Sequence, residues 1–238
     1  MASIPVTGQF SAKDGKILDS NGLQFKGQGI NVFPGQVDAA AILSTFPGIK
    51  TVRVATTPGT DPAQIDALVQ GLTSHGVVVE IEDHSSSGAA FSPNGDNVLT
   101  GQALTDETNW YAGLAAKYKT NPNVWFGTAN EPDAPGDLDS IARQEIAIYN
   151  AIRGAGNNSV VMLEERGGFT MDFAHPYAAD YAKMTNVAVD LHFYGWGAKY
   201  STDPSVISQS FSPNTVHLSV WSPHMGFWAQ TLGILKLF

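Results

Sequence analysis

A glutamate follows a short apolar run in the middle of the chain and could act as a general acid/base. Val124–Phe126 is wholly apolar and contains one β-branched and two aromatic residues, which is typical of a strand buried on both faces. A polar tetrad follows at 130–133, and because Pro132 cannot continue a sheet ladder, the strand must finish by Glu131. In parallel α/β folds the chemistry lies outside the carboxyl ends of the strands. We therefore predict that Glu131 is a general acid/base at a strand end.

Two other predicted strand ends carry a basic or titratable side chain. Arg53 interrupts the apolar run 51–55, where a buried guanidinium is costly unless it meets a carboxylate. The alternative for Arg53 is an isolated salt bridge at a sheet edge. His84 follows the strongly apolar run 77–81, and a histidine that faces a loop or a helix is an equally good interpretation there.

An aromatic segment follows the last clear apolar run. His192 and Tyr194 are two residues apart, so both rings point the same way if the segment is extended. Trp196 continues that face and could offer a flat platform for the C–H face of a sugar ring, although core packing is as good an explanation. Trp110 and Trp125 are better explained as core residues.

The elements that would position these residues alternate along the chain. Strands are predicted to end near Asn31, Arg53, Asp83, Ala129, Leu163 and Asp190, and helices are predicted over 38–45, 61–75, 105–120, 138–153 and 178–184. The third helix should start with a capping box at Thr105. This alternation, at a spacing of roughly 25–40 residues, is typical of βαβ units and a parallel sheet. We predict an α/β fold of the (β/α)8 TIM-barrel type in a single domain, 1–238, preceded by an N-terminal β-hairpin near Asp14-Gly15.

The C-terminal segment 204–238 is atypical. It holds no Asp or Glu in 35 residues, although 22 acidic residues in 238 would predict about three. A seventh strand is predicted over 215–221, and the strongly apolar stretch 226–238 must be packed away or drive association. A barrel that is incomplete or irregular after its sixth strand would have exposed sheet edges. We therefore predict that the tail fills that gap or forms a homodimer interface.

Composition excludes several classes of partner. A net charge of −9 argues against nucleic acid and against anionic membranes, both of which need a basic face. The chain has no cysteine, no phosphate-cradling glycine loop and no histidine spacing typical of a metal site, so we expect neither a metal nor another cofactor. No signal peptide is apparent at Met1, and a secreted or extracellular protein would have lost it before this form of the chain.

Five of these motifs occur together in an order and spacing that resemble a known enzyme family. They are Gly29-Ile30-Asn31, Val52-Arg53-Val54, Asp83-His84, Asn130-Glu131-Pro132 and His192-Phe193-Tyr194. The pattern, over residues 8–200, is similar to glycoside hydrolase family 5, which contains retaining (β/α)8-barrel cellulases and mannanases. The resemblance implies hydrolysis of O-glycosidic bonds in a β-linked glucan or mannan, with an oligo- or polysaccharide as the partner.

The resemblance also implies a role for each matching residue. Glu131 matches the acid/base, and Asn130 matches the neighbour that contacts the sugar 2-hydroxyl. Arg53 matches the arginine that steadies the nucleophile. His84, His192 and Tyr194 match residues of the family that form substrate subsites or position the nucleophile.

The sequence departs from the family at the nucleophile. The resemblance implies a Glu at the end of the seventh strand, but no Glu follows Glu165, and Arg53 would then lack its expected partner. The tail is truncated or frameshifted, another carboxylate substitutes, or the protein is a non-catalytic carbohydrate-binding or remnant barrel. Candidate substitutes are Glu82, Asp83, Glu164 and Glu165. Surface or salt-bridge carboxylates are the favoured interpretation of all four, and only one of the adjacent pair 164 and 165 can face inward.

Overall fold

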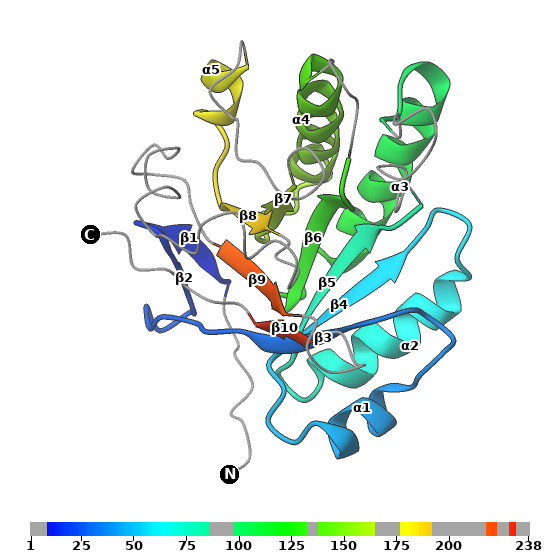
Figure 1. Cartoon of the computed structure of the whole chain (residues 1–238), viewed down its shortest axis with the longest axis vertical. Coiled ribbons are helices and arrows are strands. Elements are labelled where there is room, and N and C mark those ends of the chain that lie inside the picture. The colour runs from blue at the N-terminus through cyan, green and yellow to red at the C-terminus, as the bar shows by residue number, and fades with distance from the viewer. Residues whose placement is uncertain are drawn as a thin grey trace.

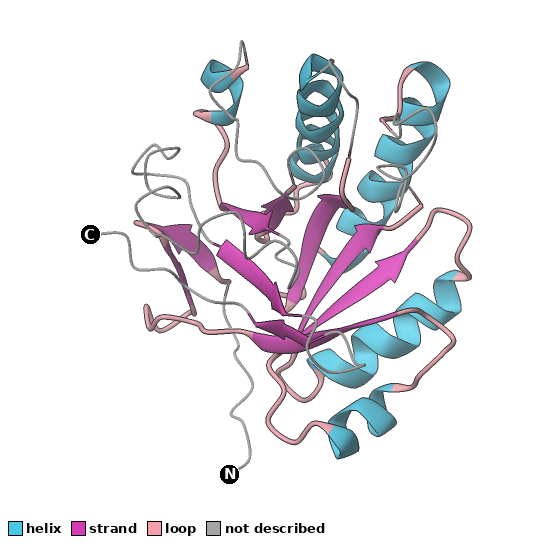
Figure 2. Ribbon diagram, in the orientation of Figure 1, coloured by secondary structure: helices cyan, strands magenta, loops and turns pink. Residues whose placement is uncertain are grey.

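The strands form a closed ring with helices outside it (Figures 1 and 2). The computed structural model describes residues 9–85, 98–132, 138–164, 177–191, 218–222 and 229–231. Ring order follows chain order, and each neighbouring pair from β3 to β9 is parallel. The ring strands are β3 (Gln28–Val32), β4 (Thr51–Thr56), β5 (Val78–Asp83), β6 (Val124–Ala129), β7 (Val161–Leu163), β8 (Val187–Leu191), β9 (Leu218–Ser222) and β10 (Ala229–Thr231). All six predicted strand ends are confirmed, and β9 overlaps the predicted seventh strand.

The last strand makes the barrel irregular. β10 lies antiparallel to both of its neighbours, β9 and β3, and so closes the ring with the opposite strand direction. The predicted irregularity after the sixth strand is therefore confirmed. The prediction that the apolar tail fills the gap is confirmed, because a short strand from the tail pairs with both sides of it. Dimerisation through the rest of the tail stays a prediction.

Five helices in the described part of the chain lie outside the ring, and they follow the predicted positions closely. They are α1 (Ala39–Thr45), α2 (Pro62–Thr73), α3 (Gly101–Tyr118), α4 (Leu138–Gly154) and α5 (Ala178–Tyr181). Asp61 caps α2 by accepting a hydrogen bond from the Ala63 amide, and Pro62 fits the first turn, where its missing N–H is not needed. None of the helices in the described ranges is long and apolar enough to cross a membrane.

The predicted start of α3 is wrong by four residues. The helix begins at Gly101, and Thr105 lies inside it with its hydroxyl donating to the Gly101 carbonyl at 3.1 Å. The Thr105 hydroxyl bonds to a carbonyl one turn earlier instead of capping free backbone amides, so the Thr-Asp-Glu pattern does not mark the start of the helix. Glu107, the last residue of that pattern, is buried, as described below.

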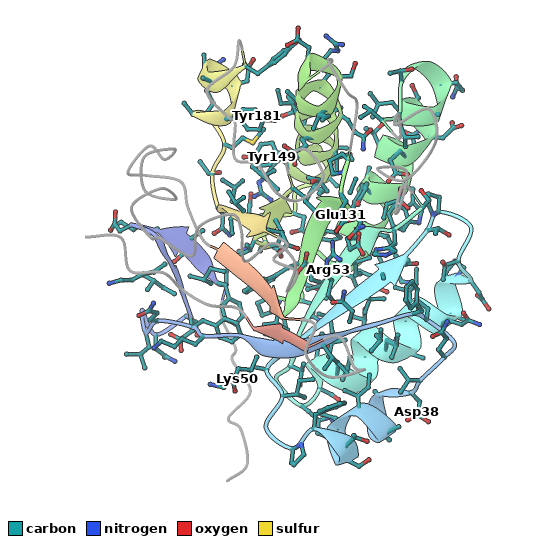
Figure 3. All side chains as sticks on the ribbon, in the orientation of Figure 1. Asp38, Lys50, Arg53, Glu131, Tyr149 and Tyr181 are labelled. Carbon is teal, nitrogen blue, oxygen red and sulfur yellow. The ribbon has the colours of Figure 1, made fainter. Side chains whose placement is uncertain are left out.

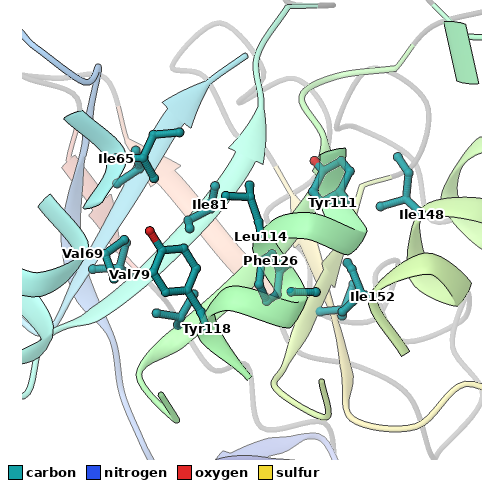
Figure 4. Packing of buried hydrophobic residues seen from close by; sticks show 14 of the residues in the cluster. Ile65, Val69, Val79, Ile81, Tyr111, Leu114, Tyr118, Phe126, Ile148 and Ile152 are labelled. Atoms are coloured by element: carbon teal, nitrogen blue, oxygen red, sulfur yellow. The ribbon is translucent and has the colours of Figure 1, made fainter. Parts of the chain in front are cut away.

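Alternate strand residues separate two apolar clusters. Residues that point outward from the strands, such as Val79, Ile81 and Phe126, pack against Tyr111, Leu114 and other helix residues (Figure 4). Residues that point the other way form a smaller cluster with the N-terminal hairpin. Its members are Phe10, Ile17, Val78, Trp125, Val160, Met162 and Ala188. The core position predicted for Trp125 is confirmed.

The N-terminal hairpin, β1 (Ser11–Lys13) and β2 (Lys16–Leu18), belongs to this inner cluster. Asp14 and Gly15 both have positive φ, as the tight turn requires. Phe10 meets the ring of Trp125 edge to face, with centroids 5.2 Å apart. Asn186, which precedes β8, fixes the hairpin by accepting from the Ala12 amide at 2.6 Å and donating to the Phe10 carbonyl at 3.1 Å. The hairpin therefore packs on the inner residues of the strands and leaves the carboxyl ends for the site.

We predict that Phe10→Ala lowers the free energy of unfolding by about 3–5 kcal/mol, because Phe10 is 1% exposed and its removal leaves a cavity. Leu23→Ala, also near the hairpin but 66% exposed, should change it by less than about 0.5 kcal/mol. Urea unfolding of both variants measures the difference. Equal losses would show that the hairpin does not pack as described.

Candidate active site

A buried arginine organises the interior of the barrel. Arg53, on β4, is 1% exposed, and four carboxylates surround its guanidinium. The nitrogen–oxygen distances are 3.2 Å to Glu82, 3.1 Å to Glu164 and 3.6 Å to both Glu80 and Asp190. Burial alone would lower the pKa of Arg53, but the carboxylates, Glu82 first, raise it well above its usual value. The expectation that a buried Arg53 meets a carboxylate is therefore confirmed, although none of these four carboxylates comes from the seventh strand.

Two of these carboxylates come from β5, and a glycine on the next strand makes room for them. A Cβ at Gly127 would lie 2.7 Å from the Cβ of Glu82 and 2.8 Å from an oxygen of Glu80. Atoms this close must move apart, so β6 can pass the two glutamates only with a glycine there. The gap in the β6 side chains is part of what lets the charged cluster form.

Glu131 lies near Arg53 (Figure 3) and is joined to this cluster through its neighbour and its own backbone. Asn130 accepts a hydrogen bond from Arg53 at 3.0 Å, and Glu164 accepts one from the Glu131 amide at 2.7 Å. The strand ends at Ala129, so Glu131 lies just beyond it, as predicted, and is 8% exposed. Its φ of 46° is a left-handed conformation that a residue with a side chain adopts only under constraint. Such strain is frequent at functional sites.

His84 lies at the edge of the same cluster. Its Nδ1 is 2.6 Å from an oxygen of Glu82, and its ring meets Phe33 edge to face at 5.5 Å. Phe33 directly follows β3 and is 45% exposed. His84 therefore connects the buried glutamate with the partly exposed surface at the strand ends.

A second pair of carboxyl groups lies behind the strand ends. Glu107 of α3 hydrogen-bonds to Asp83, and both side chains are at most 2% exposed. Burial, with the nearby charge of Asp83, raises the pKa of Glu107 to about 8, and burial raises the pKa of Asp83 too. Glu107 is therefore the partner that holds the proton at neutral pH. The Asp83 carbonyl accepts from the Asn130 amide at 2.9 Å, so this pair supports the backbone beside Glu131.

The same region is tied together by a buried tyrosine. The Tyr111 hydroxyl accepts from the Asp83 amide at 2.9 Å and contacts the carbonyls of Gly127, at 2.7 Å, and Thr128. The ends of β5 and β6 are therefore joined through one side chain of α3.

The structure brings four of the predicted site residues to one end of the barrel: Arg53, His84, Asn130 and Glu131. Predicted residues His192, Tyr194 and Trp196 lie outside the described residues, as does Glu165. For Glu82 and Glu164 the salt-bridge interpretation is right and the surface alternative is wrong, because both are buried.

Sequence reasoning missed three carboxylates of this region: Glu80, Asp190 and Glu107. The available signal was an acidic residue at a position where the period of the strand or helix predicts a core side chain. Across the described residues, no group of three or more His, Asp or Glu side chains is arranged to hold a metal ion.

Fold and site together define a barrel protein of the α/β class with a polar, carboxylate-rich site at the carboxyl ends of its strands. Residues 16–222 match the family model described as Cellulase (glycosyl hydrolase family 5). The chain belongs to glycosyl hydrolase family 5.

Two curated relatives are similar to this chain. Endoglucanase N of Pectobacterium atrosepticum and Endoglucanase 5 of Pectobacterium carotovorum subsp. carotovorum are each 27% identical in an alignment of 203 residues that covers 79% of this chain. The match spans 43% and 38% of those proteins, so the chain corresponds to less than half of their length.

Solved structures support the fold. The catalytic domain of Thermobifida fusca endoglucanase Cel5A, in its E355Q form with cellotetraose, has a TM-score of 0.68 at 17% identity. That match covers 90% of this chain and 73% of the other. A β-mannanase from Streptomyces thermolilacinus with mannohexaose has a TM-score of 0.67 at 21% identity, covering 88% and 72%.

We predict that Arg53→Met lowers the free energy of unfolding by about 3–5 kcal/mol near neutral pH, because four buried carboxylates lose their guanidinium. The loss should shrink as the pH falls toward 5, since the stranded carboxyl groups can then take up protons. Arg53→Lys keeps the charge without the planar fork and should lose less. Urea unfolding at several pH values measures all three proteins. A loss of stability in Arg53→Met, relative to the wild type, that is the same at pH 5 and pH 8 would contradict the ion cluster.

We predict that the Asp83–Glu107 pair makes the protein less stable as the pH rises from about 4.5 to about 8. The folded form holds a proton on Glu107 up to a pKa of about 8, whereas the unfolded chain releases it near 4.5. Stability from this group is therefore complete below pH 4.5 and is lost as the pH approaches 8. Glu107→Gln should flatten the dependence of unfolding free energy on pH.

The matched control for Glu107→Gln is Asp106→Asn, an exposed neighbour on the same helix, which should leave the pH dependence unchanged. Chemical denaturation at pH 5, 6.5 and 8.5 compares the slopes. A Glu107→Gln slope that equals the wild-type slope would show that Glu107 does not titrate as described.

Proposed function

We propose that this chain acts on O-glycosidic bonds of a β-linked glucan or mannan, with Glu131 as the general acid/base. The observation that carries the proposal is the position of Glu131: it is buried at the carboxyl end of β6, beside an asparagine that bonds the central arginine. Membership of glycosyl hydrolase family 5 supports it, as do relatives that include endoglucanases and mannanases. Polysaccharides of this kind lie outside cells, so we propose that the protein works extracellularly.

The chemistry requires a carboxylic acid that protonates the leaving oxygen and a second carboxylate about 5 Å away that attacks the sugar. Burial and a neighbouring negative charge favour the protonated form that an acid needs. Glu131 is 8% exposed and its backbone amide donates to the Glu164 carboxylate, so the residue is buried and its backbone is held in place. Asn130 would contact the sugar 2-hydroxyl, and subsite or positioning contacts would come from His84, His192, Tyr194 and Trp196.

The proposed reaction also needs a second carboxylate as nucleophile, and the buried carboxylates of the cluster are engaged in other contacts. Glu164 uses one oxygen for the Glu131 amide and the other for Arg53. Glu82 is 0% exposed and contacts both Arg53 and His84. Neither is placed to attack a sugar, and no Glu follows Glu165 in the sequence. We therefore expect slow turnover, and the same observation favours a second candidate function, carbohydrate binding without cleavage.

We predict that Glu131→Gln lowers turnover of cello- or manno-oligosaccharides by about 10²–10⁴-fold, because the amide can neither donate nor take the proton. Release of reducing ends measures turnover. Asp106→Asn, an exposed and equally conservative change, should keep the wild-type rate. Unchanged activity in Glu131→Gln would remove Glu131 from the mechanism.

Titration calorimetry with the same oligosaccharides separates the two candidate functions. A hydrolase shows turnover that depends on Glu131. A binding protein shows heat of binding with no product, and its affinity should survive Glu131→Gln within a few-fold.

A further inference from the structure

Helix α4 carries a glutamate in the middle of its apolar face. Glu145 is 1% exposed and lies in line with Ile141, Ile148 and Ile152, which are all fully buried. The spacing of four, three and four residues is that of a stripe that faces the core. A carboxylate in such a stripe is expensive to bury unless donors satisfy it.

Three donors converge on the two oxygens of Glu145. The Thr128 hydroxyl, on β6, and the Glu164 amide, just after β7, donate to one oxygen at 3.0 and 2.6 Å. The Tyr181 hydroxyl of α5 donates to the other at 2.9 Å. Two adjacent strand ends and a second helix are therefore tied to one side chain from outside the barrel.

Glu164 links Glu145 to Glu131, the candidate acid/base. Its backbone amide is held by Glu145, while its side chain accepts from the Glu131 amide at 2.7 Å and pairs with Arg53 at 3.1 Å. Glu131 has the strained left-handed φ of 46°. A backbone in this conformation relaxes unless its surroundings hold it, and the Glu164 carboxylate is a contact that does so.

We propose that Glu145, acting through Glu164, is a positioning residue that fixes the backbone of Glu131 for proton transfer. The inference rests on the proposed function, because its kinetic consequence needs Glu131 to be the acid/base. Glu145 accepts three hydrogen bonds and touches no reacting atom. Glu145→Gln keeps the shape of the side chain but turns one acceptor into a donor that faces donors. The contact between Glu145 and the Glu164 amide, called the clamp below, is therefore weakened.

The kinetic test compares substrates with poor and good leaving groups. An oligosaccharide needs proton donation to its leaving oxygen, whereas a 2,4-dinitrophenyl glycoside leaves without it. A displaced acid should therefore lower kcat/KM for the oligosaccharide by about 10–100-fold and for the dinitrophenyl glycoside by less than about threefold. A change that only lowers the folded fraction would reduce both equally.

Tyr149→Phe is the matched control on the same helix. Tyr149 is buried on α4, but its hydroxyl bonds Thr185, which precedes the start of β8 and so belongs to the opposite end of the parallel strands from Glu131. Its loss should leave the ratio of the two kcat/KM values unchanged. Thr128→Val, which removes one donor to Glu145, replaces Glu145→Gln if that variant does not fold, and it should shift the ratio in the same direction.

Amide hydrogen exchange supplies a readout that does not need activity. Loosening the clamp should speed exchange of the Glu131 amide at least tenfold in Glu145→Gln but not in Tyr149→Phe. Unchanged exchange overturns the inference, and so does faster exchange with an unchanged substrate ratio in an active enzyme. If the wild-type protein cleaves neither substrate while exchange responds, the proposed function fails and the clamp stands.

Discussion

The guanidinium of Arg53 is the constraint on which the rest of the barrel depends. It stands in the parallel ladder directly opposite Glu80, with Glu82 two residues further along β5, and receives Glu164 and Asp190 from the far side of the ring. Buried ion pairs add little net stability, because desolvation offsets their attraction. What this cluster specifies is register. A slip of one residue between β4 and β5 would turn the charged side chains toward the apolar helices and the valines into the barrel, so the alternative pairings are strongly disfavoured.

The polar residues at the strand ends require hydrogen-bond partners from the helices that surround the barrel. Strand ends that carry polar groups leave backbone amides and hydroxyls facing the helices, and an all-apolar helix face could not satisfy them. Helices α3 and α4 meet this need in the same way, each with one glutamate within its apolar stripe: Glu107 beside Asp83, and Glu145 across the ends of β6 and β7. The two glutamates differ in their partners. Glu107 faces another carboxylate and keeps a proton, whereas three donors surround Glu145.

Local sequence patterns predicted the elements and the parallel pairing of successive strands well, but not the strand that closes the ring. Buried strands appear in the sequence as short apolar runs, and the Asn-Glu-Pro motif correctly predicted the end of β6. The antiparallel strand β10 could not be predicted, since its three residues carry no periodic signal and their partners are fixed by the gap that the other strands leave. Arg53 was expected to need one carboxylate from the seventh strand. Its actual partners come from β5, β8 and the residue after β7, which only the closed ring brings together.

The contacts of Arg53 and Glu164 also decide which carboxylates could take part in catalysis. A guanidinium offers five N–H donors, and the described contacts of Arg53 already extend to four carboxylates and Asn130. Any further carboxylate that Arg53 steadied for attack on a sugar would have to approach a guanidinium whose charge four buried carboxylates already surround. Glu164 cannot leave the cluster, because it would release the strained backbone of Glu131 as it did so. The contacts that hold the candidate acid/base Glu131 are therefore the same contacts that occupy both oxygens of Glu164.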